Sequence, residues 1–180
     1  MKHYFSIILT TAIIMHFASA QQEFATFQDT TNKFTVAYPS TWRVQPKNPG
    51  YVVIFYADSG KNMNNYHSNV SITLYDTAGR HSTLEGHRER ILKFIDAFTD
   101  SLVIDQTEGT TMGGIPGHLL VYRGVQFSKQ LKYLKGFVLN NGKVYHVTYT
   151  ATLSEYDKYS DAAMKMIQSF AFITAPKIKK

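Results

Sequence analysis

The sequence has no cysteine, so no disulfide stabilises the fold and no thiolate is present as a nucleophile or a zinc ligand. It contains neither the G-x-S-x-G turn of serine hydrolases nor the H-E-x-x-H pair of zinc proteases. No apolar run reaches the roughly 20 residues that a membrane-spanning helix needs. These absences predict a chain that folds by packing alone and is not an enzyme.

The first 20 residues have the pattern of a secretory signal peptide. A basic start is followed by the mainly apolar stretch 5–17 and by a small-residue cleavage site at 18–20. We therefore expect residues 1–20 to be removed on export, 21–174 to form a single domain, and 175–180 to be a basic C-terminal tail. The mature protein is then periplasmic or secreted, with no transmembrane segment.

The charge of the chain is unbalanced. It has 19 lysines and arginines against 13 aspartates and glutamates, a formal net charge of +6 at pH 7. Such an excess favours anionic partners through long-range attraction, although it also serves solubility. Nucleic acid is not expected as a partner because an exported protein rarely meets it, and we expect a protein partner in the cell envelope.

Hydrophobic alternation with a period of two dominates the domain and predicts strands. Asn141-Gly142 between two such runs predicts a tight hairpin turn, and 113–117 reads as a glycine-rich turn. The resulting fold class is α+β, with a central antiparallel sheet of roughly seven or eight strands and helices packed on it. The expected strands are 24–29, 34–38, 51–56, 69–75, 103–107, 118–123, 130–139 and 143–152, and 171–174 can add a short last one.

Two helices are predicted by period-3.6 apolar stripes. The first spans 82–98, with Ser82 and Glu85 as a capping box and an apolar stripe that includes Ile95 and Phe98. The second begins at Ser154 and closes the domain near Phe170.

Three local patterns together resemble the PsbP-like family, including its bacterial DcrB-type relatives. They are the strand 34–39 followed by Trp42, the Gly-Ile-Pro-Gly turn at 114–117, and the terminal hairpin with its helix ending at Ser169-Phe170. The resemblance implies an α/β/α sandwich and a non-catalytic accessory protein that docks on an envelope or membrane-complex partner. Some family members bind calcium, manganese or zinc.

Basic and aromatic side chains gather on three neighbouring predicted strands. Facing outward together, they would form a surface for an acidic protein or an anionic headgroup. The alternative is an ordinary solvated lysine face, which also protects sheet edges from aggregation. The predicted partner-binding residues are Arg123, Lys129, Lys132, Tyr133, Lys135 and Lys143.

A small-ligand or divalent-metal site is the alternative function. His81 and Glu85 are four residues apart near a helix start, so both can face one ion. A capping histidine beside a surface glutamate explains the same pair, and no cofactor is otherwise expected. The twelve tyrosines of the chain can line a ligand cleft or fill the core.

Overall fold

The computed structural model describes residues 22–57, 66–77 and 82–174. The predicted signal peptide, most of the 58–68 loop, His81 and the C-terminal tail lie outside these ranges. The helices are α1 (Leu84–Phe98) and α2 (Tyr156–Ser169). The strands are β1 (Phe24–Asp29), β2 (Phe34–Pro39), β3 (Arg43–Pro46), β4 (Val53–Tyr56), β5 (Asn69–Asp76), β6 (Asp100–Met112), β7 (Ile115–Gln126), β8 (Lys129–Asn140), β9 (Lys143–Thr152) and β10 (Ala171–Phe172).

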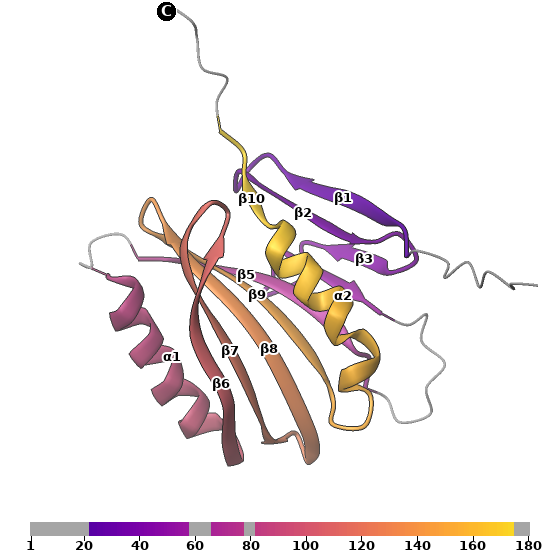
Figure 1. The fold of residues 1–180 in the computed structure, drawn as a ribbon, viewed down its shortest axis with the longest axis vertical. Helices are drawn as coiled ribbons and strands as arrows, with labels where there is room; N and C mark the ends of the chain where they lie inside the picture. The colour runs from indigo at the N-terminus through magenta and orange to yellow at the C-terminus, as the bar shows by residue number, and fades with distance from the viewer. Residues whose placement is uncertain (1–21, 58–65, 78–81, 175–180) are drawn as a thin grey trace, which may run out of the picture.

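Seven of these strands form one antiparallel sheet in the order β3-β4-β5-β9-β8-β7-β6. β1, β2 and β10 form a smaller antiparallel sheet that lies beside α2, whereas α1 lies by the β6 edge of the large sheet (Figure 1). The predicted α+β class and central antiparallel sheet are confirmed.

The β8–β9 hairpin sets the register at the centre of the sheet. Asn141 and Gly142 adopt φ values of 50° and 72°, as a two-residue turn between twisted strands requires. The pairing places Lys135 opposite Thr148 and His146 opposite Phe137. Because side chains alternate across a strand, all four point to the same face of the sheet.

Strand boundaries differ from the predictions where the pattern is weak. β3 was not predicted because its four residues show no alternation. β6 is 13 residues long, whereas only five of its residues were predicted to form a strand. Most of this edge strand is exposed and polar and it carries two register shifts, so its sequence shows little alternation. The turn predicted over 113–117 is confined to Gly113 and Gly114, both with positive φ, and Pro116 pairs with Thr111 inside the β6–β7 hairpin.

One face of the large sheet, the α2 face, carries the main core. α2 and the small sheet pack together on it, and Phe34 stacks on Phe170 with ring centroids 5.3 Å apart. Trp42 is buried against Tyr159 of α2, in a T-shaped contact. The helix approaches closely over Gly136, where a Cβ would lie 2.6 Å from the Ile167 side chain.

The opposite face, the α1 face, carries a smaller apolar cluster. Ile95 of α1 packs with Leu120, Tyr122, Leu131 and Tyr133 of the sheet. The helices therefore cover opposite faces, which makes the α/β/α sandwich that the family resemblance implied.

The predicted helix caps were wrong in detail. α1 is capped by Thr83, whose hydroxyl accepts from the Gly86 amide at 3.0 Å, and not by Ser82. α2 begins at Tyr156 rather than Ser154, and no side chain caps it. Phe98, predicted to lie on the buried stripe, is 64% exposed, because the stripe turns away from the sheet at the last turn of α1.

Candidate functional site

A cleft of ≈ 500 Å³, here called the α1 cleft, lies between α1 and the α1 face of the sheet. The helix contributes one wall, which carries a buried histidine, a cation and three apolar side chains. These are His87, Arg90, Ile91, Phe94 and Ile95.

The sheet contributes the other wall, which is richer in polar groups. Gln126 and Tyr122 lie toward one end, and Tyr75, which is 53% exposed, lies at the surface. Lys135 and His146 come from the β8–β9 hairpin, which the Asn-Gly turn holds in register. The cleft therefore combines aromatic and aliphatic surface with a few converging polar groups, as small-molecule sites do.

Three titratable side chains form a continuous chain at the cleft wall. The Nε2 atoms of His87 and His146 are 2.8 Å apart. Nζ of Lys135 lies 3.4 Å from Nδ1 of His146 and donates to Oγ1 of Thr148 at 2.9 Å. His87 and His146 are 8% and 1% exposed, so this is a buried polar network and not a surface coincidence.

The donors and acceptors of these three side chains can be assigned. An ammonium group only donates, so Lys135 makes Nδ1 of His146 the acceptor. The proton of His146 is then on Nε2, which donates to His87, and neutral His87 carries its proton on Nδ1. The tautomers follow from this hydrogen-bond pattern.

Both histidines are held neutral. Burial, together with the positive charges of Arg90 and Lys135, lowers the pKa of His87 to about 4. Burial, then the charges of Lys135 and His87, lowers the pKa of His146 well below its usual value. Burial also lowers the pKa of Lys135 to about 8, which leaves the lysine mostly protonated at neutral pH.

The charged side chains described at the cleft are all positive. Arg90 and Lys135 line it, and none of the described residues lining it is acidic. Lys135 has two acceptors, His146 and Thr148, so one of its three ammonium hydrogens is available to a ligand. Arg90 donates to the Ser82 hydroxyl at 3.3 Å and keeps its other guanidinium donors.

A second series of hydrogen bonds holds the part of the sheet beside the cleft. Tyr133 stacks on Tyr122 with centroids 4.4 Å apart, and its hydroxyl donates to Gln126 at 2.6 Å. The Gln126 amide in turn donates to the Thr99 hydroxyl at 2.6 Å. This arrangement fixes two of the residues that line the cleft.

The structure divides the predicted partner-binding residues between the two faces of the sheet. Tyr133 and Lys135 belong to the α1 face. Lys132 and Arg123 belong to the α2 face, where both contact Asp105, at 3.5 Å and 3.0 Å.

Other contacts of these residues confirm the division. The Lys132 ammonium lies 4.5 Å from the centre of the Tyr156 ring, at the start of α2. Lys129 and Lys143 are the first residues of β8 and β9, so they lie at opposite ends of the hairpin. The six residues do not form one surface, and their role in partner binding stays a prediction.

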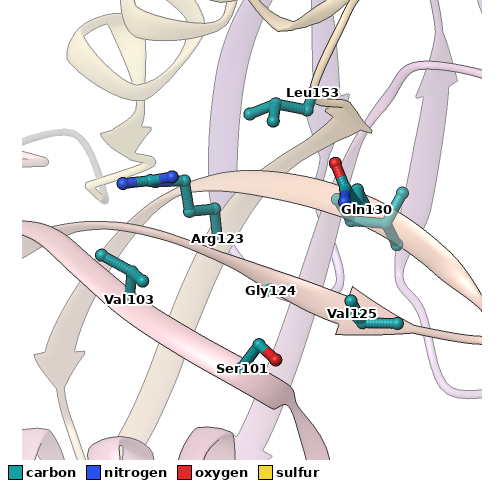
Figure 2. A pocket seen from close by; sticks show the side chains of 8 residues that line it. Ser101, Val103, Arg123, Gly124, Val125, Gln130 and Leu153 are labelled. Atoms are coloured by element: carbon teal, nitrogen blue, oxygen red, sulfur yellow. The ribbon is translucent and has the colours of Figure 1, made fainter.

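Arg123 also borders a second, smaller hollow of ≈ 190 Å³. Figure 2 shows Arg123 and Val103 on adjacent strands, and Leu153, which follows β9, lines the same hollow. Since its cation is already paired with Asp105, this hollow offers a ligand less charge than the α1 cleft does.

The predicted metal pair is only half described. His81 lies outside the described residues, and Glu85 is bound by Arg88 and lies 3.4 Å from Nε2 of His118. Among residues 22–57, 66–77 and 82–174, no three histidines or carboxylates gather closely enough to hold a metal ion. The two buried histidines offer nitrogen ligands, but their Nε2 atoms bind each other.

His87 and His146 were not singled out from the sequence, although a signal existed. His87 lies four residues before Ile91 and eight before Ile95, so it shares their stripe on the helix. His146 follows Tyr145 in β9 and alternates with it, which places it on the α1 face with Thr148. A histidine on each of two facing surfaces is the pattern that would have drawn attention to the pair.

Comparison with known proteins yields a family model described as PsbP-like protein, which matches residues 15–172. No curated protein matches the sequence significantly. No helix in the described ranges has the length and apolarity needed to cross a bilayer.

Several solved structures share the fold. Cyanobacterial PsbP from Synechocystis sp. PCC 6803 has a TM-score of 0.59 and 17% identity, covering 86% of this chain and 95% of its own. LpqN, involved in cell envelope biogenesis of Mycobacterium tuberculosis, has a TM-score of 0.58 and 13% identity, covering 84% and 91%. PA94 from Pseudomonas aeruginosa, a putative regulator, has a TM-score of 0.57 and 14% identity, covering 87% and 99%. At these identities the likeness establishes the fold alone.

Proposed function

The chain belongs to the PsbP-like protein family, and on that premise we propose that it is an exported, non-catalytic binding protein whose binding site is the α1 cleft. The observation that carries the proposal is the convergence of Lys135, Arg90 and three aromatic side chains on one cleft of ≈ 500 Å³. This size lies within the range that small-molecule sites occupy.

The network at the cleft wall supports binding rather than catalysis. A general base needs a free lone pair within reach of a substrate proton. Here the Nε2 atoms of His87 and His146 are occupied by each other, and Nδ1 of His146 faces the Lys135 ammonium. Such a network orients its side chains and leaves neither histidine with a free lone pair.

A cleft-filling variant tests the proposal. Ile91→Trp places a large side chain in the cleft, whereas Ala97→Trp puts the same residue on an exposed position of the same helix. In a thermal-shift screen of small organic anions and apolar molecules, a ligand of the cleft raises the melting temperature of the native protein and of Ala97→Trp, but not of Ile91→Trp. A ligand that stabilises all three proteins equally binds elsewhere and would refute the assignment.

Docking on a membrane-complex partner is a second candidate, favoured by exposed aromatic surface beside the cleft. Phe94 and Phe98 are 61% and 64% exposed, with ring centroids 4.6 Å apart. Aromatic side chains in this position are typical of protein interfaces.

Serine substitutions distinguish this candidate from cleft binding. Phe98→Ser should reduce capture of an envelope partner by the immobilised protein, whereas Phe127→Ser, at an 88% exposed position on the β7–β8 turn, should leave it unchanged. Equal capture by both variants would exclude α1 as the docking surface. Charge reversal of Lys132 and of Lys135, made separately, tests the two halves of the predicted basic patch.

A further inference from the structure

The α1 cleft has an uneven distribution of charge that specifies a class of ligand. Two cations, Lys135 and Arg90, border it, while Ile91, Phe94 and Tyr122 provide apolar surface. No acidic residue among the described lining neutralises the cations. A ligand that complements this wall carries a negative group joined to an apolar body.

The position of Lys135 is the central observation. Its ammonium is held at a fixed place by Thr148 at 2.9 Å and His146 at 3.4 Å, both on β9. Both of these partners are neutral, and none of the described residues that line the cleft is a counter-ion to the lysine, so among these residues its charge is stabilised by dipoles alone. An anion that enters the cleft would supply the missing charge at a half-buried ammonium, where ion pairs are stronger than at a fully exposed surface.

The available donors match a carboxylate. Lys135 retains one N–H, and the Arg90 guanidinium has donors beyond the one that contacts Ser82. A carboxylate has two oxygens and one charge, and guanidinium and ammonium groups are its usual partners.

The apolar side of the cleft is continuous with solvent. Phe94 and Tyr75 are 61% and 53% exposed, so the hydrophobic part of the cleft opens at the surface. A chain-like body can lie between these residues and extend outward, and burying the exposed rings would contribute to binding. A small polar anion such as acetate would leave this surface uncovered.

We propose that the α1 cleft binds amphipathic monocarboxylates, with the carboxylate on Lys135 and Arg90 and the apolar body along Ile91, Phe94 and Tyr75. This inference rests on the proposed function, because it names the ligand of the same cleft. His146, which is itself held by His87, positions Lys135.

The test is isothermal titration calorimetry of the purified protein with four probes that separate head from body. They are dodecanoate, dodecan-1-ol, dodecyltrimethylammonium and acetate, at neutral pH, with the two ionic amphiphiles below their micelle concentrations and the alcohol below its solubility limit. Dodecanoate is expected to bind at least tenfold more tightly than each of the others. Equal binding of dodecan-1-ol and dodecanoate would overturn the carboxylate assignment and leave the cleft as an apolar site.

Matched variants locate the head group. Lys135→Met removes the charge and keeps an unbranched side chain of similar size, and Arg90→Gln replaces the guanidinium with a shorter, uncharged amide at an exposed position that tolerates change. Each is expected to weaken dodecanoate at least tenfold and to leave dodecan-1-ol unaffected. Lys93→Met removes one charge from the exposed side of α1 and should change neither affinity.

The outcomes separate the two proposals. Dodecanoate binding that is unchanged in both Lys135→Met and Arg90→Gln would overturn the ligand assignment even if binding occurs. Binding that survives Ile91→Trp would overturn the cleft itself. Should Lys135→Met fail to fold, Arg90→Gln alone decides the head-group question.

Discussion

The two faces of the seven-stranded sheet differ in how completely they are buried. The α2 face is covered by α2 and the small sheet together. Its central side chains, among them Val138, Val147 and Tyr149, are fully buried. The α1 face has one helix over it and a cleft beside the helix. The same strands therefore provide a closed apolar core on one side and one wall of an open cleft on the other.

The chemistry of the two faces differs as well. β9 presents tyrosine, valine and alanine to the α2 face but His146, Thr148 and Thr150 to the α1 face, where all three are at most 9% exposed. In an antiparallel sheet the polar face is ordinarily solvated. These buried polar side chains support the binding role that we propose for the α1 face.

Truncation of an aromatic residue should give the largest contrast between the faces. Phe170→Ala removes a side chain that is 2% exposed and stacked on Phe34, so it should lower the free energy of unfolding by about 3–5 kcal/mol. Phe94→Ala, at the exposed mouth of the cleft, should change it by less than about 0.5 kcal/mol. Urea denaturation measures both values, and similar losses would show that the α1 face is as much a core as the α2 face.

Acidification should destabilise the protein through the buried histidines. The pKa of His87 is lowered to about 4 in the folded state, so between that value and the ordinary 6.5 the unfolded state binds more protons. Stability contributed by neutral His87 is complete above pH 6.5 and is lost as the pH falls. From pH 7 to pH 5 this group alone should lower the free energy of unfolding by about 2 kcal/mol, and His146 acts in the same direction.

His87→Gln keeps a polar side chain but removes the titration. It should flatten the dependence of the unfolding free energy on pH between 5 and 7. Denaturation curves at several pH values provide the measurement, and an unchanged slope would mean that the pKa of His87 is the same in the folded and unfolded states.

The sequence predicted the α2 face well because its signals are strong and local. Phe34 and Val36 alternate in β2, Val70 and Ile72 alternate in β5, and all four are fully buried as expected. The Asn141-Gly142 turn fixed the central hairpin and hence the face of every residue in it. These features depend on neighbours in the chain, which a sequence displays directly.

The α1 cleft was not predicted because it depends on where α1 docks. Parity along β8 and β9 places Lys135 and His146 on one face, but only the packing of α1 brings His87 within 2.8 Å of His146. The same alternation of side chains along β8 places Lys132 and Lys135 on opposite faces of the sheet, although the predicted basic patch contained both. Phe98 is exposed because the last turn of α1 does not pack on the sheet. The period of the apolar residues predicts which face of a helix is buried, but it does not predict where along the helix the contact with the sheet ends.

Removal of the cleft lysine should change the titration of its neighbours more than the stability of the fold. The charge of Lys135 contributes to the lowered pKa of both His87 and His146. Lys135→Met should therefore raise both pKa values, as followed by NMR of the imidazole protons, whereas Lys93→Met should not. No change in either histidine would indicate that Lys135 points away from the pair in solution.

The smallest expected contrast concerns the starts of the two helices. Thr83→Ala removes the hydroxyl that caps α1 and should cost about 1 kcal/mol. Ser154→Ala should change the unfolding free energy by less than about 0.5 kcal/mol, because no side chain caps α2. Thermal or urea denaturation can compare them, and an equal cost would assign Ser154 a capping role that the structure does not give it.

The most direct test of the binding site is chemical-shift mapping of the isotope-labelled protein during titration with dodecanoate. The account predicts that the perturbed amides gather around Tyr75, Ile91, Phe94, Tyr122 and Lys135, on both walls of the α1 cleft. Perturbations centred instead on α2 and the small sheet, or on the hollow beside Arg123, would contradict it.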